Sequence, residues 1–135
     1  MAGQGDWLNL YYERGKFGFG LYGGEAGSET VLSDTPVQIG SWYYVVGVLE
    51  GKQLRIYVAQ RAGDGSVGSF TSKSAGMSRT LANPGGCKFV IGGDVEGDWC
   101  DPDEPGSNQF YGIVDEVRVY NRALSEQEIR SLVSR

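Results

Sequence analysis

Glycine divides this sequence into short runs of aromatic and β-branched residues. The chain contains 22 glycines in 135 residues, more than twice the average share of about 7%. Some come as pairs, such as Gly23-Gly24 and Gly92-Gly93, and they follow no collagen-like period. Only four residues are proline, so the composition is not that of a disordered linker. Glycine between short apolar runs is typical of tight turns between strands, and the sequence therefore predicts an all-β fold.

Two strand pairs are predicted from the alternation of side chains. Residues 7–13 present two faces, and residues 17–22 return after a short turn with bulky side chains at every second position. This is the pattern of a β-hairpin. A second pair is predicted from Trp42–Leu49 and Leu54–Val58. The first of these is apolar on both faces, as a central strand covered on both sides would be.

Other parts of the chain give weaker signals. Short strands are predicted at residues 30–32 and 88–92. Residues 60–80 are rich in glycine and serine, and they are predicted to form a long excursion over the surface.

The last apolar run, Phe110–Tyr120, is predicted to be a strand with a carboxylate on its apolar face. With period two, Asp115 shares a face with Tyr111, Ile113, Val117 and Val119. An unpaired carboxylate in such a place would be costly. Asp115 is therefore expected to meet a cation, to accept hydrogen bonds from backbone N–H groups, or to be protonated.

One helix is predicted at the C-terminal end of the chain. Ser125 is the expected N-cap and Glu128 follows three residues later, which is the spacing of a capping box. Leu124 and Ile129 occupy the positions of a hydrophobic staple. The helix should run from about residue 125 to Val133, and at this length it needs to pack on a sheet to be stable.

Composition and length exclude several classes of protein. The chain has the size of one domain, and its net charge of −5 with no basic run argues against nucleic-acid binding. There is no histidine, which removes histidine-dependent nucleophilic sites and the usual zinc ligand sets. No apolar stretch approaches the roughly 18–20 residues that span a bilayer. The start of the chain lacks the features of a signal peptide.

Two cysteines are present, Cys87 and Cys100. Their separation is too large for a CxxC redox or zinc motif. A chain that runs up one strand and folds back can bring the two sulfurs together, so a disulfide and two inert thiols are both open at this point.

The stretch from Phe110 to Ile129 resembles the C-terminal signature of laminin-G-like, concanavalin A-like jelly-roll domains, F-x-G-x-I-D-E-V-R-V-Y-N-R-A-L-S-x-x-E-I. The run from Trp42 to Val58 is similar to the family's W-x-x-V-A-x-V and L-x-L-Y-V-N-G hairpin, and Phe89–Gly93 is similar to its L-x-I-G strand. The resemblance covers the chain from Trp7 onward. It implies an antiparallel β-sandwich, a single domain over residues 1–135, and a family whose members are usually extracellular.

Two departures from the family pattern affect what the domain can do. The Asn-Gly that usually follows the hairpin strand is replaced by Ala59-Gln60-Arg61. The family's N-terminal segments F-D-G-x-x-D-Y and T-x-x-x-W are also missing. The chain is therefore either a trimmed domain or a smaller sandwich whose edges are closed by a second copy. Of the two, we favour a symmetric homodimer for the chain alone.

The sequence favours a non-catalytic module. Hydrolases of the wider superfamily resemble a strand with Glu-x-Asp-x-x-Glu, whose carboxylates act about 5–5.5 Å apart. No such motif occurs here. The adjacent pairs Asp115-Glu116 and Asp103-Glu104 would point to opposite faces of an extended strand.

Calcium is the candidate metal. In the superfamily, the aspartate of a V-D-x-V-R-V-Y strand commonly holds a structural calcium ion, and Asp115 occupies that position. The remaining ligands would normally come from the missing N-terminal segment, and backbone N–H groups or an arginine can satisfy Asp115 instead. The acidic loop Asp94–Glu104 supplies further candidates in Asp94, Glu96 and Asp98, although its spacing resembles a calcium loop only loosely. A solvated acidic loop is the simpler interpretation.

Sugar binding would need exposed aromatic rings with polar neighbours. Trp99 is the foremost candidate because a tryptophan among carboxylates has no evident core role, although it can also cap the sandwich or lie in a dimer interface. The other candidates are Tyr22, Tyr43 and Tyr111. Three further aromatic residues occupy framework positions of the family and are predicted to be core: Trp42, Tyr44 and Tyr57.

The leading hypothesis is an all-β jelly-roll sandwich with a short C-terminal helix that recognises a carbohydrate or glycoconjugate, with calcium as a candidate cofactor. The alternative is a structural or protein–protein interaction module that dimerises and has no sugar site. The fold itself does not decide between them, because it serves many binding functions.

Overall fold

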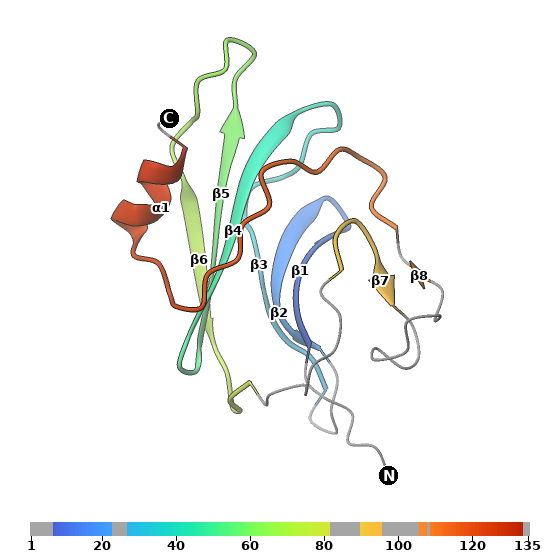
Figure 1. Ribbon diagram of the computed structural model, residues 1–135, viewed down its shortest axis with the longest axis vertical. Helices are drawn as coiled ribbons and strands as arrows, with labels where there is room; N and C mark the ends of the chain where they lie inside the picture. Colours follow the sequence, from blue (N-terminus) through green and yellow to red (C-terminus); the bar gives the residue numbers. More distant parts are fainter. Residues whose placement is uncertain (1–6, 23–26, 82–89, 96–105, 108, 134–135) are drawn as a thin grey trace. The chain divides into compact units, whose positions relative to one another are not determined.

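The computed structural model describes residues 7–22, 27–81, 90–95, 106–107 and 109–133 (Figure 1). These residues form two compact units, which are drawn from residues 1–82 with 120–135 and from residues 83–119. The prediction of a single domain over the whole chain remains a prediction. The elements in chain order are β1 (Trp7–Glu13), β2 (Lys16–Tyr22), β3 (Glu29–Leu32), β4 (Trp42–Glu50), β5 (Gln53–Arg61), β6 (Thr71–Gly76), β7 (Asp94–Val95), β8 (Gly106–Ser107) and α1 (Glu126–Leu132).

The first sheet has the strand order β1-β2-β3 and is antiparallel throughout. It contains the predicted hairpin, with Glu13 opposite Lys16. The two turn residues, Arg14 and Gly15, both have positive φ, at 49° and 81°. This is the conformation of a type I′ turn, whose twist matches that of the flanking strands. The weak strand predicted at residues 30–32 is confirmed as part of β3.

The second sheet has the order β4-β5-β6 and contains the second predicted hairpin, with Glu50 opposite Gln53. Two predictions about this sheet were wrong. Residues 60–80 are not only a surface excursion, because β6 lies there and pairs with β5. Its sequence, TSKSAG, is polar and gives no apolar alternation. The central strand is β5, whereas β4 is an outer strand of the three that the structure describes.

An apolar core lies between these two sheets, and both sheets belong to the same unit. It is built from every second residue of the strands, as the pleat requires. Gly47 of β4 sits where an added Cβ would overlap the ring of Phe19, so this position must lack a side chain for the sheets to approach. The buried residues of the core are Phe19, Leu21, Val31, Leu54, Ile56, Val58 and Met77.

The outer face of the second sheet carries α1, which lies beside β5 and β6 in Figure 1. Leu124 and Ile129 pack with Val48 of β4 and Tyr57 of β5 in a second buried cluster. The predicted capping box is confirmed: the Ser125 hydroxyl accepts from the Glu128 N–H, and the Glu128 carboxylate accepts from the Ser125 N–H. This short helix therefore depends on its packing against the sheet.

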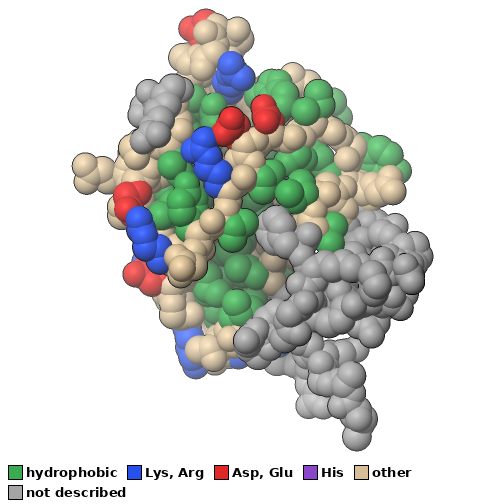
Figure 2. Space-filling view, viewed as in Figure 1, with side chains coloured by type: hydrophobic (Ala, Val, Ile, Leu, Met, Phe, Trp, Pro, Cys, Tyr) green, Lys and Arg blue, Asp and Glu red, His purple; other side chains and the backbone are tan. Residues whose placement is uncertain are grey.

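Charged side chains in this unit occur mainly in opposite pairs. Figure 2 shows lysine and arginine side chains lying beside aspartate and glutamate on the viewed face. Lys73 Nζ lies 2.6 Å from Asp34 Oδ1, and Arg79 Nε lies 3.3 Å from Glu29 Oε2 in the least exposed of the ion pairs between described residues. The first pair joins the segment after β3 to β6, and the second joins β3 to the segment after β6.

In the unit drawn from residues 83–119, β7 and β8 form a two-stranded antiparallel ladder. The predicted strand at residues 110–120 is absent, and so is a strand at residues 90–92; residues 88 and 89 lie outside the described residues. A strand needs a partner for its backbone groups, and no described strand pairs with this segment. Glu116 also has a φ of 53°, which interrupts an extended two-face pattern.

Candidate functional site

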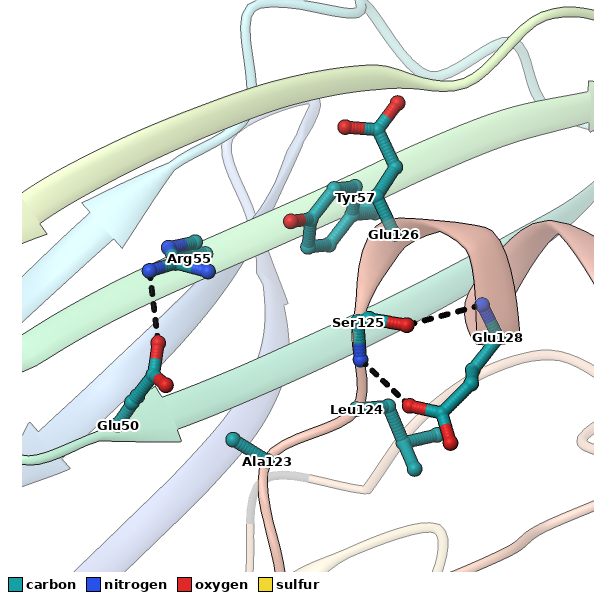
Figure 3. Close-up of a pocket in the computed structure, with 8 residues that line it drawn as sticks. All are labelled: Glu50, Arg55, Tyr57, Ala123, Leu124, Ser125, Glu126 and Glu128. Atoms are coloured by element: carbon teal, nitrogen blue, oxygen red, sulfur yellow. Dashed lines mark hydrogen bonds and ion pairs between the residues drawn. The ribbon is translucent and has the colours of Figure 1, made fainter.

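Two pockets of similar volume lie in the unit that contains the sandwich. The helix pocket, of about 380 Å³, is drawn in Figure 3 and lies where α1 begins. The tryptophan pocket, of about 350 Å³, lies where β4 begins and β5 ends. The helix pocket is lined by Glu50, Arg55, Tyr57, Ala123, Leu124, Ser125, Glu126 and Glu128. The tryptophan pocket is lined by Gly40, Ser41, Trp42, Gln60, Arg61, Ala62, Gly63 and Gly65.

The polar groups of the helix pocket are paired with one another or with nearby residues. Arg55 Nη2 lies 2.8 Å from Glu50 Oε2, and Figure 3 marks this ion pair with a dashed line. The hydroxyl of Tyr57 and the carboxylate of Glu50 together raise the pKa of the Arg55 guanidinium. Glu126 is bound by Arg130 one turn along the helix. These groups therefore have little bonding capacity left for a ligand.

Glu128 is the most perturbed carboxylate in the helix pocket. Arg122 Nη2 lies 2.7 Å from its Oε1, and the Ser125 N–H donates to its Oε2 at 2.8 Å. Hydrogen bonds from Arg122 and then from Ser125 lower the pKa of Glu128 to about 2. Because a carboxylate held ionised by its capping bonds does not exchange protons near neutral pH, this group is part of the helix start and is not suited to acid–base chemistry.

The tryptophan pocket is built by the register of the β4–β5 hairpin. Trp42 and Arg61 are directly opposite one another in the ladder, so their side chains lie on the same face of the second sheet. The indole of Trp42 is 42% exposed. This corrects the prediction that Trp42 is a core residue: it is the first residue of β4, where the second sheet ends.

Ser41 and Gln60, two of the residues that line the tryptophan pocket, are held by hydrogen bonds. The amide nitrogen of Gln60 donates to Gln38 Oε1 at 3.3 Å and to Ser41 Oγ at 3.2 Å. The Gln38 N–H in turn donates to the Tyr43 hydroxyl at 2.8 Å. These bonds hold the two side-chain amides in place, while Gln60 Oε1 and Gln38 Nε2 make no hydrogen bond to any described residue.

Arg61 extends over the loop that follows β5. An added Cβ at Gly65, whose φ is 89°, would lie 3.5 Å from Arg61 Nη2. Among the described residues, Arg61 has no ion pair. The one carboxylate of this loop, Asp64, accepts instead from the Ser66 hydroxyl at 2.6 Å and from the Ser66 N–H at 2.9 Å. These two bonds lower the pKa of Asp64.

The predicted aromatic residues that the structure describes are divided between the two units. Tyr43 packs its ring against Phe17, with centroids 5.4 Å apart, and borders the core, so it is not an exposed platform. The Tyr22 ring meets that of Tyr11 edge-on at 5.3 Å. Tyr111 is 96% exposed but belongs to the other unit. Trp99 lies outside the described residues.

Of the candidate calcium ligands, the structure describes the side chain of Asp115 alone. Asp115 is exposed, which corrects the expectation that it lies on a buried apolar face, and its Oδ1 accepts from the Glu116 N–H at 2.8 Å. No three acidic or cysteine side chains within the described ranges lie close enough to hold a metal ion. The side chain of Asp94 and the whole of Glu96, Asp98, Cys87 and Cys100 lie outside those ranges.

Sequence reasoning missed Trp42, Gln60 and Arg61 as site residues. One signal was available: Arg61 ends the stretch in which this chain departs from the family's Asn-Gly turn. In this chain β5 continues to Arg61, which places a cation opposite Trp42. In the part of the chain that the structure describes, no helix has the length and apolar character needed to cross a membrane.

Comparison with known proteins identifies the family. Residues 1–130 match the family model described as the concanavalin A-like lectin/glucanases superfamily. No curated protein matches the sequence. The chain is similar to a crystal structure of an S-layer domain-containing protein (residues 221–444) from Clostridium thermocellum, with 24% sequence identity and a TM-score of 0.46. The match covers 98% of this chain and 64% of that one. The β-sandwich described above thus has its family: the chain belongs to the concanavalin A-like lectin/glucanase superfamily.

Proposed function

We propose that this protein is a non-catalytic binding module that recognises a carbohydrate or glycoconjugate through the tryptophan pocket. The observation that carries the proposal is the half-exposed Trp42 in a pocket that Ser41 and Gln60 also line. A pyranose ring has an apolar face that can stack on an aromatic ring and hydroxyl groups that need hydrogen-bond partners. Trp42 supplies the first kind of contact, and Ser41 and Gln60, which line the same pocket, supply the second.

The geometry of the pocket fits ligand binding without reaction. Its lining residues include no carboxylate, whereas glycoside hydrolysis needs two carboxyl groups on either side of the scissile bond. The helix pocket does contain carboxylates, but Glu50, Glu126 and Glu128 are each paired with an arginine. Membership of the superfamily is consistent with a binding function.

Calcium enters the proposal as an aid to binding and not as a resident group. Its candidate ligands are Asp115, Asp94, Glu96 and Asp98. Removal of calcium is therefore one arm of the binding experiment.

The test is binding to a panel of polysaccharides and glycans by the native protein, with calcium and again with EDTA. Trp42→Ala should weaken binding at least about tenfold, as truncation of a central aromatic contact does. Trp99→Ala is the matched comparison, since it removes the other tryptophan proposed for stacking. Loss of binding with Trp99→Ala alone would move the site to the acidic loop. Folded protein that binds no sugar would overturn the proposal.

One observation favours a second candidate, an interaction module that dimerises. Leu8, Leu10 and Tyr12 of β1 lie opposite inward-facing residues of β2, so they share the core face of the first sheet. They are nevertheless 41–50% exposed. A second copy of the chain that covers this strip would remove apolar surface from water.

Light scattering over a range of protein concentrations tests this candidate. If the strip is a dimer interface, Leu10→Lys should yield a folded monomer. The control is Leu32→Lys, because Leu32 is also exposed but lies on the opposite face of the first sheet. A native protein that stays monomeric at every concentration would exclude the dimer.

A further inference from the structure

We infer that the sugar bound in the tryptophan pocket is acidic, a pyranose that carries a carboxylate, and that Arg61 binds this group. The inference rests on the proposed function and names the ligand class for the same pocket. Among the described residues Arg61 has no ion pair, and it lies directly opposite the half-exposed Trp42 in the β4–β5 ladder. This juxtaposition carries the inference.

The surroundings of Arg61 explain why it is available. Asp64 is the carboxylate nearest to Arg61 in sequence, and it accepts its hydrogen bonds from the N–H and the hydroxyl of Ser66. The other arginine on the same face of β5, Arg55, is paired with Glu50 at 2.8 Å. An exposed guanidinium in a chain with a net charge of −5 is a local positive site on a protein that otherwise repels anions.

The shape of the pocket fits one sugar ring with its acid group. Trp42 and Arg61 extend from opposed positions of neighbouring strands, whose Cβ atoms lie about 4.5–5.5 Å apart in such pairs. A ring stacked on Trp42 therefore places a substituent within reach of Arg61. Gly63 and Gly65 line the same space, and their lack of side chains lets a ligand approach the loop backbone.

A planar carboxylate suits this arginine better than a point-like anion does. Guanidinium binds carboxylate through two parallel N–H···O bonds, and lysine cannot reproduce that geometry. Gln60 Oε1, which accepts no hydrogen bond from a described residue, is then left for the ring hydroxyls. An anion with tetrahedral oxygens, such as a sulfate ester, shares the charge but not the plane.

The experiment compares an oligogalacturonide with its methyl ester by calorimetric titration. The two ligands have the same rings, and esterification removes only the charge. The acid should bind roughly tenfold more tightly, because a hydrogen bond to a charged group contributes more than one to a neutral group. This preference should fall as salt increases. A sulfated oligosaccharide is the third ligand and tests for recognition of charge alone.

Variants assign the preference to Arg61. Arg61→Gln should bind the acid no better than the ester, and Arg61→Lys should recover only part of the preference. Arg14→Gln makes the same charge change at the exposed β1–β2 turn and should leave the preference intact. Because Arg61 is exposed at the end of β5, the Arg61 variants should have the same midpoint of thermal unfolding as the native protein.

Each outcome decides between the two claims. Equal binding of acid and ester, both lost in Trp42→Ala, overturns the acidic ligand and leaves sugar binding in place. The inference is also overturned if Arg14→Gln loses the preference for the acid as fully as Arg61→Gln does. It is overturned as well if Arg61→Lys recovers the full preference and the sulfated ligand binds tightly. Either result would show attraction by charge alone. Absence of any binding that depends on Trp42 overturns both claims.

Discussion

Arg55 and Arg61 lie on the same face of the same strand, yet the two have different surroundings. Arg55 borders the helix pocket, where Glu50 pairs with it and α1 covers the sheet. Arg61 borders the tryptophan pocket, where no described carboxylate reaches it. The two pockets have nearly equal volumes. The volume of a pocket therefore does not identify a binding site. Lining residues whose polar groups are not already paired are the better guide.

The largest effect should come from the cluster beneath the helix pocket. Ile129→Ala removes a side chain with 0% exposure and should lower the free energy of unfolding by about 2–5 kcal/mol, as measured by urea denaturation. Ile39→Ala is the matched control, because Ile39 is 99% exposed. If the helix pocket is structural, the Ile129→Ala protein that remains folded should bind sugar as the native protein does. Altered specificity would contradict a purely structural role for the helix pocket.

Filling the tryptophan pocket should weaken sugar binding and leave the stability of the protein unchanged. A Cβ at Gly63 meets nothing within 4 Å, so Gly63→Leu should leave the unfolding free energy within about 0.5 kcal/mol of the native value. It should weaken sugar binding at least about tenfold by occupying the ligand's space. Ser69→Leu, at an exposed position outside the pocket lining, is the control. Undiminished binding by Gly63→Leu would show that the ligand lies elsewhere.

Removal of the helix cap should have a moderate effect on stability alone. Ser125→Ala leaves the Glu128 N–H without its side-chain acceptor, and such changes cost about 1 kcal/mol. Thermal unfolding followed by circular dichroism measures the loss. Ser125→Asp retains an acceptor at the N-cap and should preserve most of the stability. An effect of Ser125→Ala on ligand affinity would contradict the assignment of a purely structural role to this pocket.

The smallest effect should be a dependence of stability on acid pH. The pKa of Glu128 falls from 4.5 to about 2 on folding, so the unfolded chain binds more protons than the folded one in this window. The contribution of Glu128 is complete above pH 4.5 and is lost as the pH falls toward about 2. Denaturation curves at a series of pH values should show a flatter dependence for Glu128→Gln. An equal slope in the variant would contradict the pairing with Arg122.

Local chemistry explains what could be predicted from the sequence. Both hairpins and the capped helix depend on residues close together in the chain, such as Ser125 with Glu128, and these elements are confirmed. The strand at Thr71–Gly76 was missed because its pairing with β5 is decided by a neighbour and not by its own polar pattern. The expected strand around Asp115 required a partner that alternation cannot supply.

The candidate site was predicted less well because exposure is not a local property. Aromatic character suggested Tyr43 as a platform, and the family resemblance suggested Trp42 as core. In the structure Tyr43 borders the core and Trp42 is 42% exposed. The difference arises from alternation at the end of a strand: Tyr43 points inward to Phe17, and Trp42 points outward beyond the helix. The opposition of Trp42 and Arg61 follows from a register that continues to the last residue of β5.

The contact between Gly47 and the Phe19 ring has a consequence for the order of folding. Each hairpin closes through a two-residue turn, so both can form within microseconds from neighbouring residues. The two sheets must then meet across a long stretch of chain, and that encounter sets the folding rate. The ring of Phe19 can settle only where β4 lacks a side chain. The two sheets can therefore pack closely in one alignment. Sheets that meet in a displaced alignment must separate before they can pack correctly.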